Sequence, residues 1–310
     1  MKKSLIALAI AGAMTVPAIA MADATLYGHV NISADKADNT KLNINNNGQS
    51  TTRIGVRGTA DTGMDGLVGF YHIEMGMATD NGSTALSTRL AHAGLKGDFG
   101  SFALGTQWTP HYLWGTSATD VMLSNITGNL RSSDVVYRAS RSAMYLSPNM
   151  GGFQFGAGIL ASSANSDKNV DAFNVAGQYS ANGLTVGLSH ISFESSMFNA
   201  ARDHSTSAAV SYSFGPAMLA ASVTHNELRA GGDTTPFELA GTYSVTDSTT
   251  LKVAYADHDN SAKGYGVEVQ HNLGSMTNLY VGYGEANSTL ENRAVNPGAD
   301  VFSTGIRVRF

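Results

Sequence analysis

The sequence predicts an all-β fold: a 16-stranded antiparallel transmembrane β-barrel with one long constriction loop folded inward. Three observations predict it. Apolar and polar residues alternate with period two along most of the chain, whereas a helical period is almost absent. The predicted strands are joined by short turns at one end and by longer polar links at the other. The last residues, TGIRVRF, form a strictly alternating strand that ends on an aromatic ring.

The first 22 residues have the features of a secretory signal peptide. Two lysines precede an apolar run over residues 5–14, and small residues follow at Ala20 and Ala22. The run is too short to cross a bilayer as a helix. We expect removal of residues 1–22 by cleavage after Ala22, with cleavage after Ala20 as the alternative. The mature chain, 23–310, is expected to form a single barrel domain.

The composition excludes several classes of site and partner. The chain has no cysteine, so neither a disulfide nor a thiolate metal site can form. No stretch after residue 22 approaches 18 apolar residues, so no transmembrane helix is expected. Of 19 basic side chains, 17 remain without the two leader lysines, against 24 acidic ones, and this net charge of −7 argues against nucleic acid as a partner. We expect no cofactor and no bound metal.

Sixteen strands follow from the alternation, each roughly as long as a tilted strand that crosses the hydrocarbon layer. The strand over 183–194 is irregular, because its apolar phase slips between Leu188 and Ile191, which predicts a bulge or a bend. The expected strands are 24–34, 51–60, 66–76, 86–96, 101–109, 135–147, 152–162, 170–180, 183–194, 204–214, 217–227, 236–245, 249–258, 262–272, 277–286 and 300–310.

The links between strands favour an up-and-down barrel with both termini at the short-turn rim. Short turns follow every even-numbered strand, and longer links such as 36–49, 110–134 and 287–297 follow odd-numbered ones. A soluble β-sandwich is the alternative, because it shows the same alternation. The aromatic residues argue against it, since they gather on the apolar face near the short-turn rim, as in a girdle at a membrane interface. They are Phe102, Tyr145, Phe153, Tyr179, Phe214 and Phe310.

The final strand is expected to close the barrel. Ile306, Val308 and Phe310 would face lipid, whereas Arg307 and Arg309 would point into a water-filled lumen. An open sheet edge cannot persist in a bilayer, so this strand must be ordered to its last residue in order to pair with the first strand.

Residues 110–134 form the longest segment without period two, and loops of this length inside compact folds are usually functional. A loop packed against the inner wall would narrow the aqueous channel that a barrel of this size otherwise leaves. A floppy outer loop is the alternative. Apolar residues favour packing: Trp114, Val121, Met122, Leu123, Ile126 and Leu130.

Alternation also assigns each charged residue to the lipid-facing or the lumen-facing side of its strand. A charge that faces lipid at mid-depth lowers folding stability by about 2–4 kcal/mol. Arg89 would share the lumen face with Ala91 and Ala93, which leaves His92 facing outward. Arg141 would lie outward near the loop rim. The charges assigned to the lumen are Arg53, Arg57, Glu74, Arg89 and Arg138.

Among these residues Arg53, Arg89 and Arg138 form a basic ladder, the predicted pore constriction, with Arg57 and Glu74 nearby. Asp120 and Asp134 would face them from the long loop. Opposite charges across a narrow water-filled gap set up a transverse field that filters solutes by charge and size. Three arginines against two loop acids predict a mild anion preference, although the acidic balance of the chain could attract cations at the mouths. The alternative is that these charges only keep a polar wall hydrated.

The sequence resembles the general diffusion porins of Gram-negative bacteria, which are 16-stranded and trimeric. The resemblance implies a homotrimer in outer-membrane lipid and lipopolysaccharide, and a constriction loop after the fifth strand. It also implies that Phe310 belongs to a signal read by the barrel-insertion machinery. Basic wall residues of the family match the three arginines, but many members have a further arginine where this chain has Thr106. The matching segments are ATLYG, TRIGVRGTAD, RLAHAGLKGDFGSFALGTQ, SPNMGGFQFG and the terminal RVRF.

The function expected from these features is passive diffusion of small hydrophilic solutes and ions. A substrate-selective channel, for example for sugars, is the alternative, but it needs an aromatic track and the chain has two tryptophans. A barrel hydrolase that uses Asp257, His258 and Asp259 is a further alternative, without a G-x-S-x-G or H-E-x-x-H motif to support it. We therefore expect no enzyme. A purely structural barrel would need bulky inward-facing filler, and none is expected.

Overall fold

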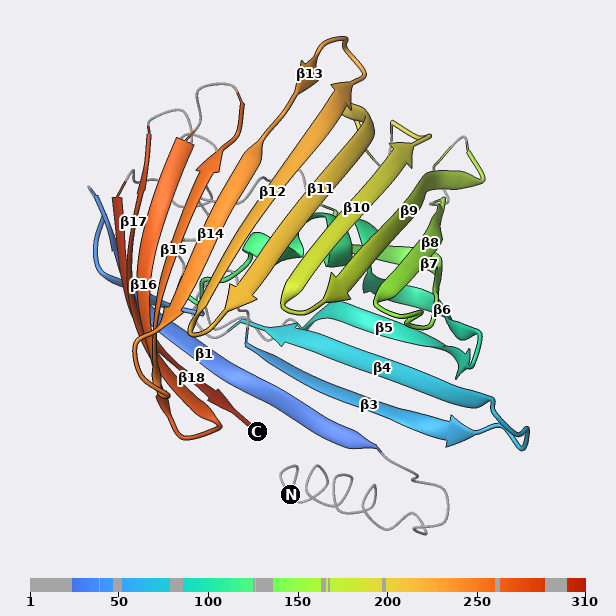
Figure 1. The fold of residues 1–310 in the computed structure, drawn as a ribbon, viewed down its shortest axis with the longest axis horizontal. Coiled ribbons are helices and arrows are strands. Elements are labelled where there is room, and N and C mark those ends of the chain that lie inside the picture. Colours follow the sequence, from blue (N-terminus) through green and yellow to red (C-terminus); the bar gives the residue numbers. More distant parts are fainter. Residues whose placement is uncertain are drawn as a thin grey trace, which may run out of the picture.

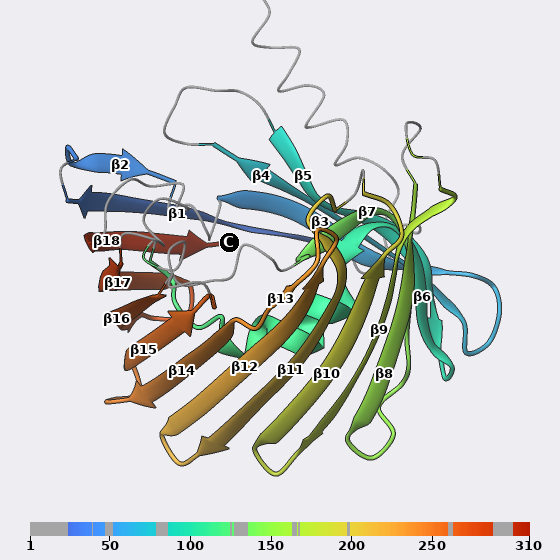
Figure 2. The same ribbon diagram turned by 90° about the horizontal axis from the view of Figure 1, so that it is seen from above.

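The computed structural model is a closed antiparallel barrel of sixteen long strands, with two short ones at its rim (Figures 1 and 2). It describes residues 24–38, 40–46, 52–78, 86–124, 126, 136–162, 166, 168–196, 199–259, 263–287 and 300–310. The strands are β1 (Thr25–Ala37), β2 (Asn43–Asn45), β3 (Arg53–Asp61), β4 (Val68–Met77), β5 (Leu86–Gly97), β6 (Gly100–Trp108), β7 (Arg138–Leu146), β8 (Phe153–Ala161), β9 (Val170–Ala181), β10 (Leu184–Phe193), β11 (Arg202–Phe214), β12 (Ala217–Leu228), β13 (Asp233–Thr234), β14 (Phe237–Ser244), β15 (Thr249–Asp257), β16 (Lys263–Leu273), β17 (Thr277–Ala286) and β18 (Asp300–Arg309).

The sixteen strands expected from the sequence are confirmed, most of them to within two residues at each end. The two short strands, β2 and β13, extend the wall at long links and were not expected. None of the helices in the described part of the chain is long and apolar enough to cross a membrane.

The first and last strands close the barrel. Residues 29–37 of β1 pair with residues 301–309 of β18, and the backbones of Gly28 and Phe310 exchange two further hydrogen bonds of 3.0 and 3.1 Å. A Cβ atom at Gly28 would lie 2.6 Å from the Phe310 ring, so a larger residue there would collide with the closing aromatic. Every long strand therefore has a partner on each side, as the bilayer requires.

The two faces of the wall differ as the alternation predicts. Apolar side chains cover the outer face, and Ile306, Val308 and Phe310 are 41%, 42% and 51% exposed. Polar side chains such as Asn31, Ser303 and Glu268 lie buried on the inner face. The predicted aromatic girdle includes the exposed rings of Phe102, Phe153, Phe214 and Phe310. In this girdle the Phe153 and Tyr179 rings lie 4.5 Å apart.

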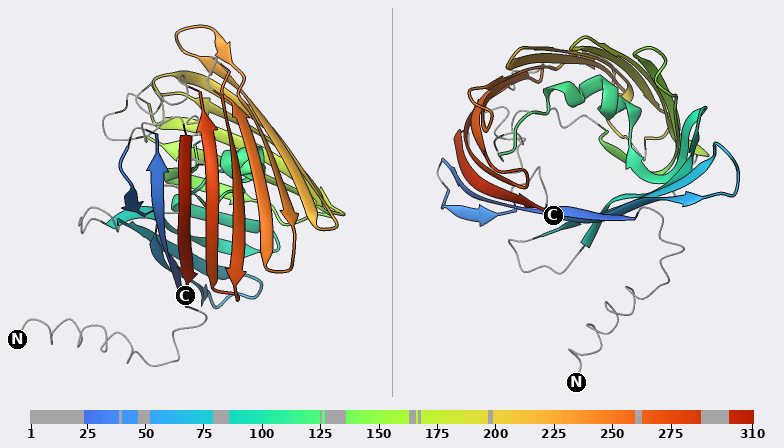
Figure 3. Two further views of the ribbon diagram at one scale, coloured as in Figure 1. Left: turned by 90° about the vertical axis from the view of Figure 1, so that its left-hand side faces the viewer. Right: turned by 60° about the horizontal axis from the view of Figure 1, so that its bottom comes forward.

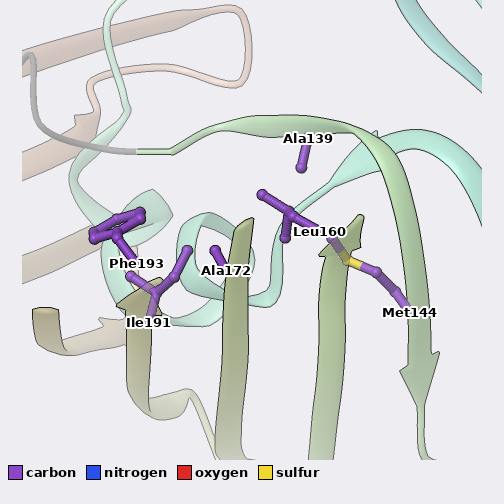
Figure 4. Packing of buried hydrophobic residues seen from close by; sticks show 6 residues of the cluster. All are labelled: Ala139, Met144, Leu160, Ala172, Ile191 and Phe193. Atoms are coloured by element: carbon purple, nitrogen blue, oxygen red, sulfur yellow. The ribbon is translucent and has the colours of Figure 1, made fainter. Parts of the chain in front are cut away.

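The prediction of a bulge between Leu188 and Ile191 is wrong. β10 pairs with both β9 and β11 without a register shift, so Leu188 faces outward and Ile191 faces inward. The slip in apolar phase arises because this part of the inner wall is also apolar. Ile191 packs in a cluster on the inner face of β7–β10 (Figure 4) with Ala139, Met144, Leu160, Ala172 and Phe193. The expectation of no bulky inward-facing apolar residues is therefore also wrong.

A bulge occurs instead between β4 and β5. Glu74 lies opposite Leu90, whereas the next residue, Met75, lies opposite Thr88, so Arg89 is the extra residue. The outward position predicted for His92 is wrong, because beyond the bulge His92 lies opposite His72 on the inner face. Arg89 still points inward, where it bonds Glu74, but its face is not shared with Ala91 and Ala93.

The assignment of faces predicts how a new charge affects stability. Val281, near the middle of β17, faces outward, whereas Gln270 on β16 faces the interior. Val281→Lys should destabilise the folded barrel by about 2–4 kcal/mol, because lipid cannot hydrate the ammonium group. Gln270→Lys, the matched control, should change stability by less than about 1 kcal/mol, because a lumen charge stays hydrated. Urea unfolding in lipid vesicles measures both, and equal losses would contradict the assignment.

Candidate functional site

The segment after β6 lies inside the barrel. Residues 110–124 and 126, called the inner loop below, begin with two short helical turns, η1 (His111–Thr116) and η2 (Ser117–Thr119). Figure 3 shows these turns, in green, along the inner side of the wall in its right-hand view. They contact β9–β12 and β14. The described part of the long loop therefore folds inward, as its apolar residues predict.

The first attachment of the inner loop is made by His111. Its backbone N–H donates a hydrogen bond to the Asn174 side-chain oxygen at 2.8 Å, and its ring nitrogens lie 3.2 and 3.4 Å from the hydroxyls of Ser189 and Ser207. Complete burial lowers the pKa of His111 to about 4, because a charged ring would be poorly solvated there.

A glycine in the wall makes this close approach possible. A Cβ atom at Gly187 would lie 1.9 Å from the Trp114 carbonyl oxygen, so no other residue fits without moving the inner loop. Glycine in a strand interior is a known sign of another backbone approaching closely. Wall and loop are therefore matched in shape at this point.

The second attachment uses one buried carboxylate. Glu268, 0% exposed, accepts hydrogen bonds from the backbone N–H groups of Leu123 and Ser124 at 2.8 and 2.6 Å. Lys252 pairs with the other Glu268 oxygen at 2.9 Å and donates to the Val121 carbonyl at 2.8 Å. These groups fix the loop backbone to β15 and β16.

Two further contacts complete the attachment. Thr119 donates a hydrogen bond to Glu238 of β14 at 2.5 Å. Ile126 is fully buried in an apolar cluster with Met122, Val301 and Ala37, the last two from β18 and β1. The inner loop is thus attached from β9 round to β18, and the alternative of a floppy outer loop is wrong for its described residues.

An open space of about 610 Å³ remains between the inner loop and the facing wall, and is called the opening below. Its residues come from both sides of the barrel and from the loop. They are Arg53, Arg89, Trp108, Tyr112, Asp120, Val121, Met122, Leu123, Tyr137, Arg138, Lys252, Gln270 and Arg307. The three arginines of the predicted ladder and Asp120 are therefore brought together.

Neighbouring aromatic rings hold the Arg138 guanidinium in place. It lies 4.8 Å from the centre of the Trp108 ring, and Trp108 stacks on Tyr112 at 4.9 Å. The Tyr112 hydroxyl donates to Asp120 at 2.8 Å. A positive charge on the wall and a negative charge on the loop are thus joined through two aromatic rings.

Glu74 lies in the wall and does not line the opening. Its Oε1 atom lies 2.7 Å from Arg89 Nε and 3.4 Å from Arg53 Nη1. The Tyr27 hydroxyl donates to its other oxygen at 2.8 Å. Glu74 therefore positions two guanidinium groups, while its own charge is largely covered.

The remaining predicted residues lie elsewhere. Arg57 is on the inner wall but lines a separate cavity, where its guanidinium lies 5.2 Å from the centre of the Tyr27 ring. Asp134 lies outside the described residues. Ile306, Val308 and Phe310 lie on the outer face at the closing seam.

Two basic residues of the opening were not predicted as part of it, Lys252 and Arg307. Period two placed both on the polar face of their strands, but only closure of the barrel brings them to the same opening as Arg53, with β1 alone between Arg307 and Arg53. Among described lining residues the opening has five basic side chains and one carboxylate, Asp120. When Glu74 and Glu268 directly behind them are counted as well, five positive charges face three negative ones, a balance of +2.

No group of three or more histidine, aspartate or glutamate side chains among the described residues could hold a metal ion. In the Asp257-His258-Asp259 segment, both carboxylates bind neighbouring strands or links of the barrel wall. Asp257 pairs with Lys263 at 2.9 Å, and Asp259 accepts a hydrogen bond from the Thr235 backbone at 2.6 Å.

Comparison with known proteins places the chain among related barrels. It is 29% identical over 311 residues to outer membrane porin protein 32 of Delftia acidovorans, a match that covers 90% of this chain and 88% of that one. The fold is similar to that of an anion-selective porin from Comamonas acidovorans, with a TM-score of 0.75, 23% identity and coverage of 93% and 99% of the two chains.

It is also similar to the trimer form of OmpT from Vibrio cholerae, with a TM-score of 0.66, 18% identity and coverage of 93% and 99%. The sequence pattern that defines Gram-negative porins matches residues 6–290, nearly the whole chain. The chain therefore belongs to the Gram-negative porin family.

Proposed function

We propose that this protein forms a channel in the outer membrane through which small hydrophilic solutes and ions diffuse passively, with a preference for anions. The observation that carries the preference is the balance of five basic side chains and one carboxylate around the opening. The related structure described as an anion-selective porin supports the same preference.

The geometry of the opening explains how such a preference arises. A solute must pass between Asp120 on the inner loop and the arginines on the facing wall. The charges on the two sides produce a transverse field across the water-filled gap, and the low-dielectric walls of the barrel focus this field. Because the positive side is stronger, the barrier is lower for an anion than for a cation of the same size.

The same residues favour general diffusion over a substrate-selective channel. Trp108 stacks on Tyr112, and the Tyr137 ring is tilted against Tyr112, with ring centres 4.9 Å apart in both pairs, so these three rings form one cluster beside the opening and not an extended track. We also propose that the protein is not an enzyme, because Asp257 and Asp259 serve structural contacts.

Three further features complete the proposal. Residues 1–22 are a signal peptide that is removed. The barrel works as a homotrimer in outer-membrane lipid and lipopolysaccharide, as the trimeric relative suggests. Phe310, with Val308 and Ile306, belongs to the signal read by the insertion machinery.

Removing one charge of the opening should weaken the anion preference. With salt screening, a charge about 7 Å from the ion path lowers the energy of an anion by about 0.3 kcal/mol and raises that of a cation by about the same amount, so Arg138→Gln should lower the anion-to-cation permeability ratio about two- to threefold. The reversal potential of single channels in a planar bilayer under a salt gradient measures the ratio.

Arg141→Gln is the matched control, because Arg141 is an exposed arginine of the same strand that does not line the opening. A cation-selective wild-type channel would contradict the proposed preference. Equal shifts in both variants would contradict the role of Arg138.

Loss of the carboxylate that holds the inner loop should make the channel unstable. Glu268→Ala removes the acceptor for two backbone N–H groups and leaves Lys252 without its carboxylate, a change that typically costs about 3–5 kcal/mol. We expect frequent current fluctuations and closure at lower voltage. Glu285→Ala, at an exposed glutamate on the outer face, should behave as wild type. Steady currents in a folded Glu268→Ala barrel would show that this carboxylate does not hold the loop.

The burial of His111 predicts a dependence on pH. A released His111 takes up a proton near its ordinary pKa of about 6.5. The docked residue does so only near a pKa of about 4. Attachment of the inner loop should therefore weaken as the pH falls from about 6.5 towards 4, with more frequent closures of single channels. His111→Gln should reduce this change, and His271→Gln, at an exposed position, should not. If the closure frequency of His111→Gln channels depended on pH in the same way as that of wild-type channels, the prediction would be contradicted.

A further inference from the structure

We propose that the inner wall has a second anion-binding station, separate from the opening, formed by Arg57, Lys96, His72 and His92. It would hold small dianions such as inorganic phosphate, phosphomonoesters or dicarboxylates. The inference deepens the proposed function and rests on it, because an anion must reach the station through the same lumen.

The station lies between the opening and the short-turn rim. Arg57 follows Arg53 by four residues on β3, about 13 Å further toward the short turn at 62–67. Lys96 lies near the end of β5, beside the next turn on the same rim. Both residues line a cavity of about 420 Å³, which does not include the ladder arginines.

The bulge at Arg89 assembles this cavity. Arg57 pairs with His72 across β3 and β4, and His72 pairs with His92 across β4 and β5, so the three side chains share the inner face. Without the bulge, His92 would face lipid and Lys96 would turn outward with it. One extra residue in β5 therefore gives the cavity two of its four polar groups.

Neighbouring residues fix the two histidine rings. The His72 and His92 rings lie 5.3 Å apart in an edge-to-face arrangement. His72 Nε2 is 2.5 Å from the Tyr27 hydroxyl, and His92 Nδ1 is 3.2 Å from the Thr106 carbonyl oxygen. These contacts use the single N–H of each neutral ring and hold both rings beside Arg57, so their other nitrogens can donate to a bound anion when the rings are protonated, whereas Arg57 and Lys96 donate in every case.

The two cations of the station have no carboxylate partner among the residues that the structure describes. Arg53 and Arg89 in the opening both contact Glu74. Arg57 and Lys96 form no salt bridge with any described residue, and no acidic side chain is among the described residues that line the cavity. Two exposed positive charges that share one cavity lower the energy of a dianion more than that of chloride.

Block of the chloride current by inorganic phosphate tests the station, with succinate as a second probe. Either dianion, added on the short-turn side, should reduce the single-channel current of the wild-type channel. The double variant Arg57→Gln/Lys96→Gln should raise the half-blocking concentration about tenfold or more. The control Arg141→Gln/Lys263→Gln removes the same charge from residues outside the cavity and should leave the value unchanged.

The outcomes separate this inference from the proposed function. If wild-type channels prefer anions but neither dianion blocks them, the station is contradicted and the proposed function is not. The same holds if the wild type and the double variant are blocked at equal concentrations. A cation-selective wild-type channel overturns the proposed function. Arg138→Gln should shift the reversal potential but not the half-blocking concentration from the short-turn side.

A second measurement does not depend on folding of a variant. Phosphate should slow acetylation of Lys96 in the wild-type protein relative to Lys263, as peptide mass spectrometry can measure. Equal rates with and without phosphate would contradict the station.

Discussion

Every other feature of this structure depends on the pairing of β1 with β18. In a bilayer, an unpaired strand edge has no water to satisfy its N–H and C=O groups, and each unsatisfied group costs several kcal/mol. The pairing of residues 29–37 with 301–309, continued by Gly28 and Phe310, removes both edges at once. Closure also brings Arg307 and Lys252 to the same opening as Arg53, so the opening exists only in the closed barrel. A sheet of sixteen strands that closes leaves a wide lumen, and the inner loop narrows it.

The inner loop explains why the inner wall departs from a purely polar face. Ile191, Phe193 and Leu160 face inward because they belong to a buried apolar cluster on β7–β10 beside the loop. Glycines at 187, 282 and 284 leave room for the loop backbone and for Ile126. Segments distant in sequence therefore match in shape and polarity, and no local pattern in either segment shows the match.

The strands and their faces were predictable from the sequence because period two is a local property. Errors occurred where a face depended on distant structure. At Ile191, the alternation of the backbone continued while the apolar pattern did not, because Ile191 packs with apolar inner-face residues of β7, β8 and β9. At His92, the bulge beside Glu74 shifted the phase by one residue, and single-residue insertions leave no clear signal in composition. The ladder arginines were assigned to the lumen correctly, whereas the contributions of Lys252 and Arg307 required the register of the closed barrel.

The sign of the charge at the opening is opposite to that of the whole chain, and the placement of the acids explains the difference. Glu74, Glu238 and Glu268 are buried in the wall, where they bond arginine, threonine, lysine or loop N–H groups. Their negative charge is therefore covered, whereas the cations line the open space. Salt screens charges that lie more than about 8–10 Å from an ion. An ion at the constriction thus responds to the nearby lining residues, so a chain with a net charge of −5 can still favour anions.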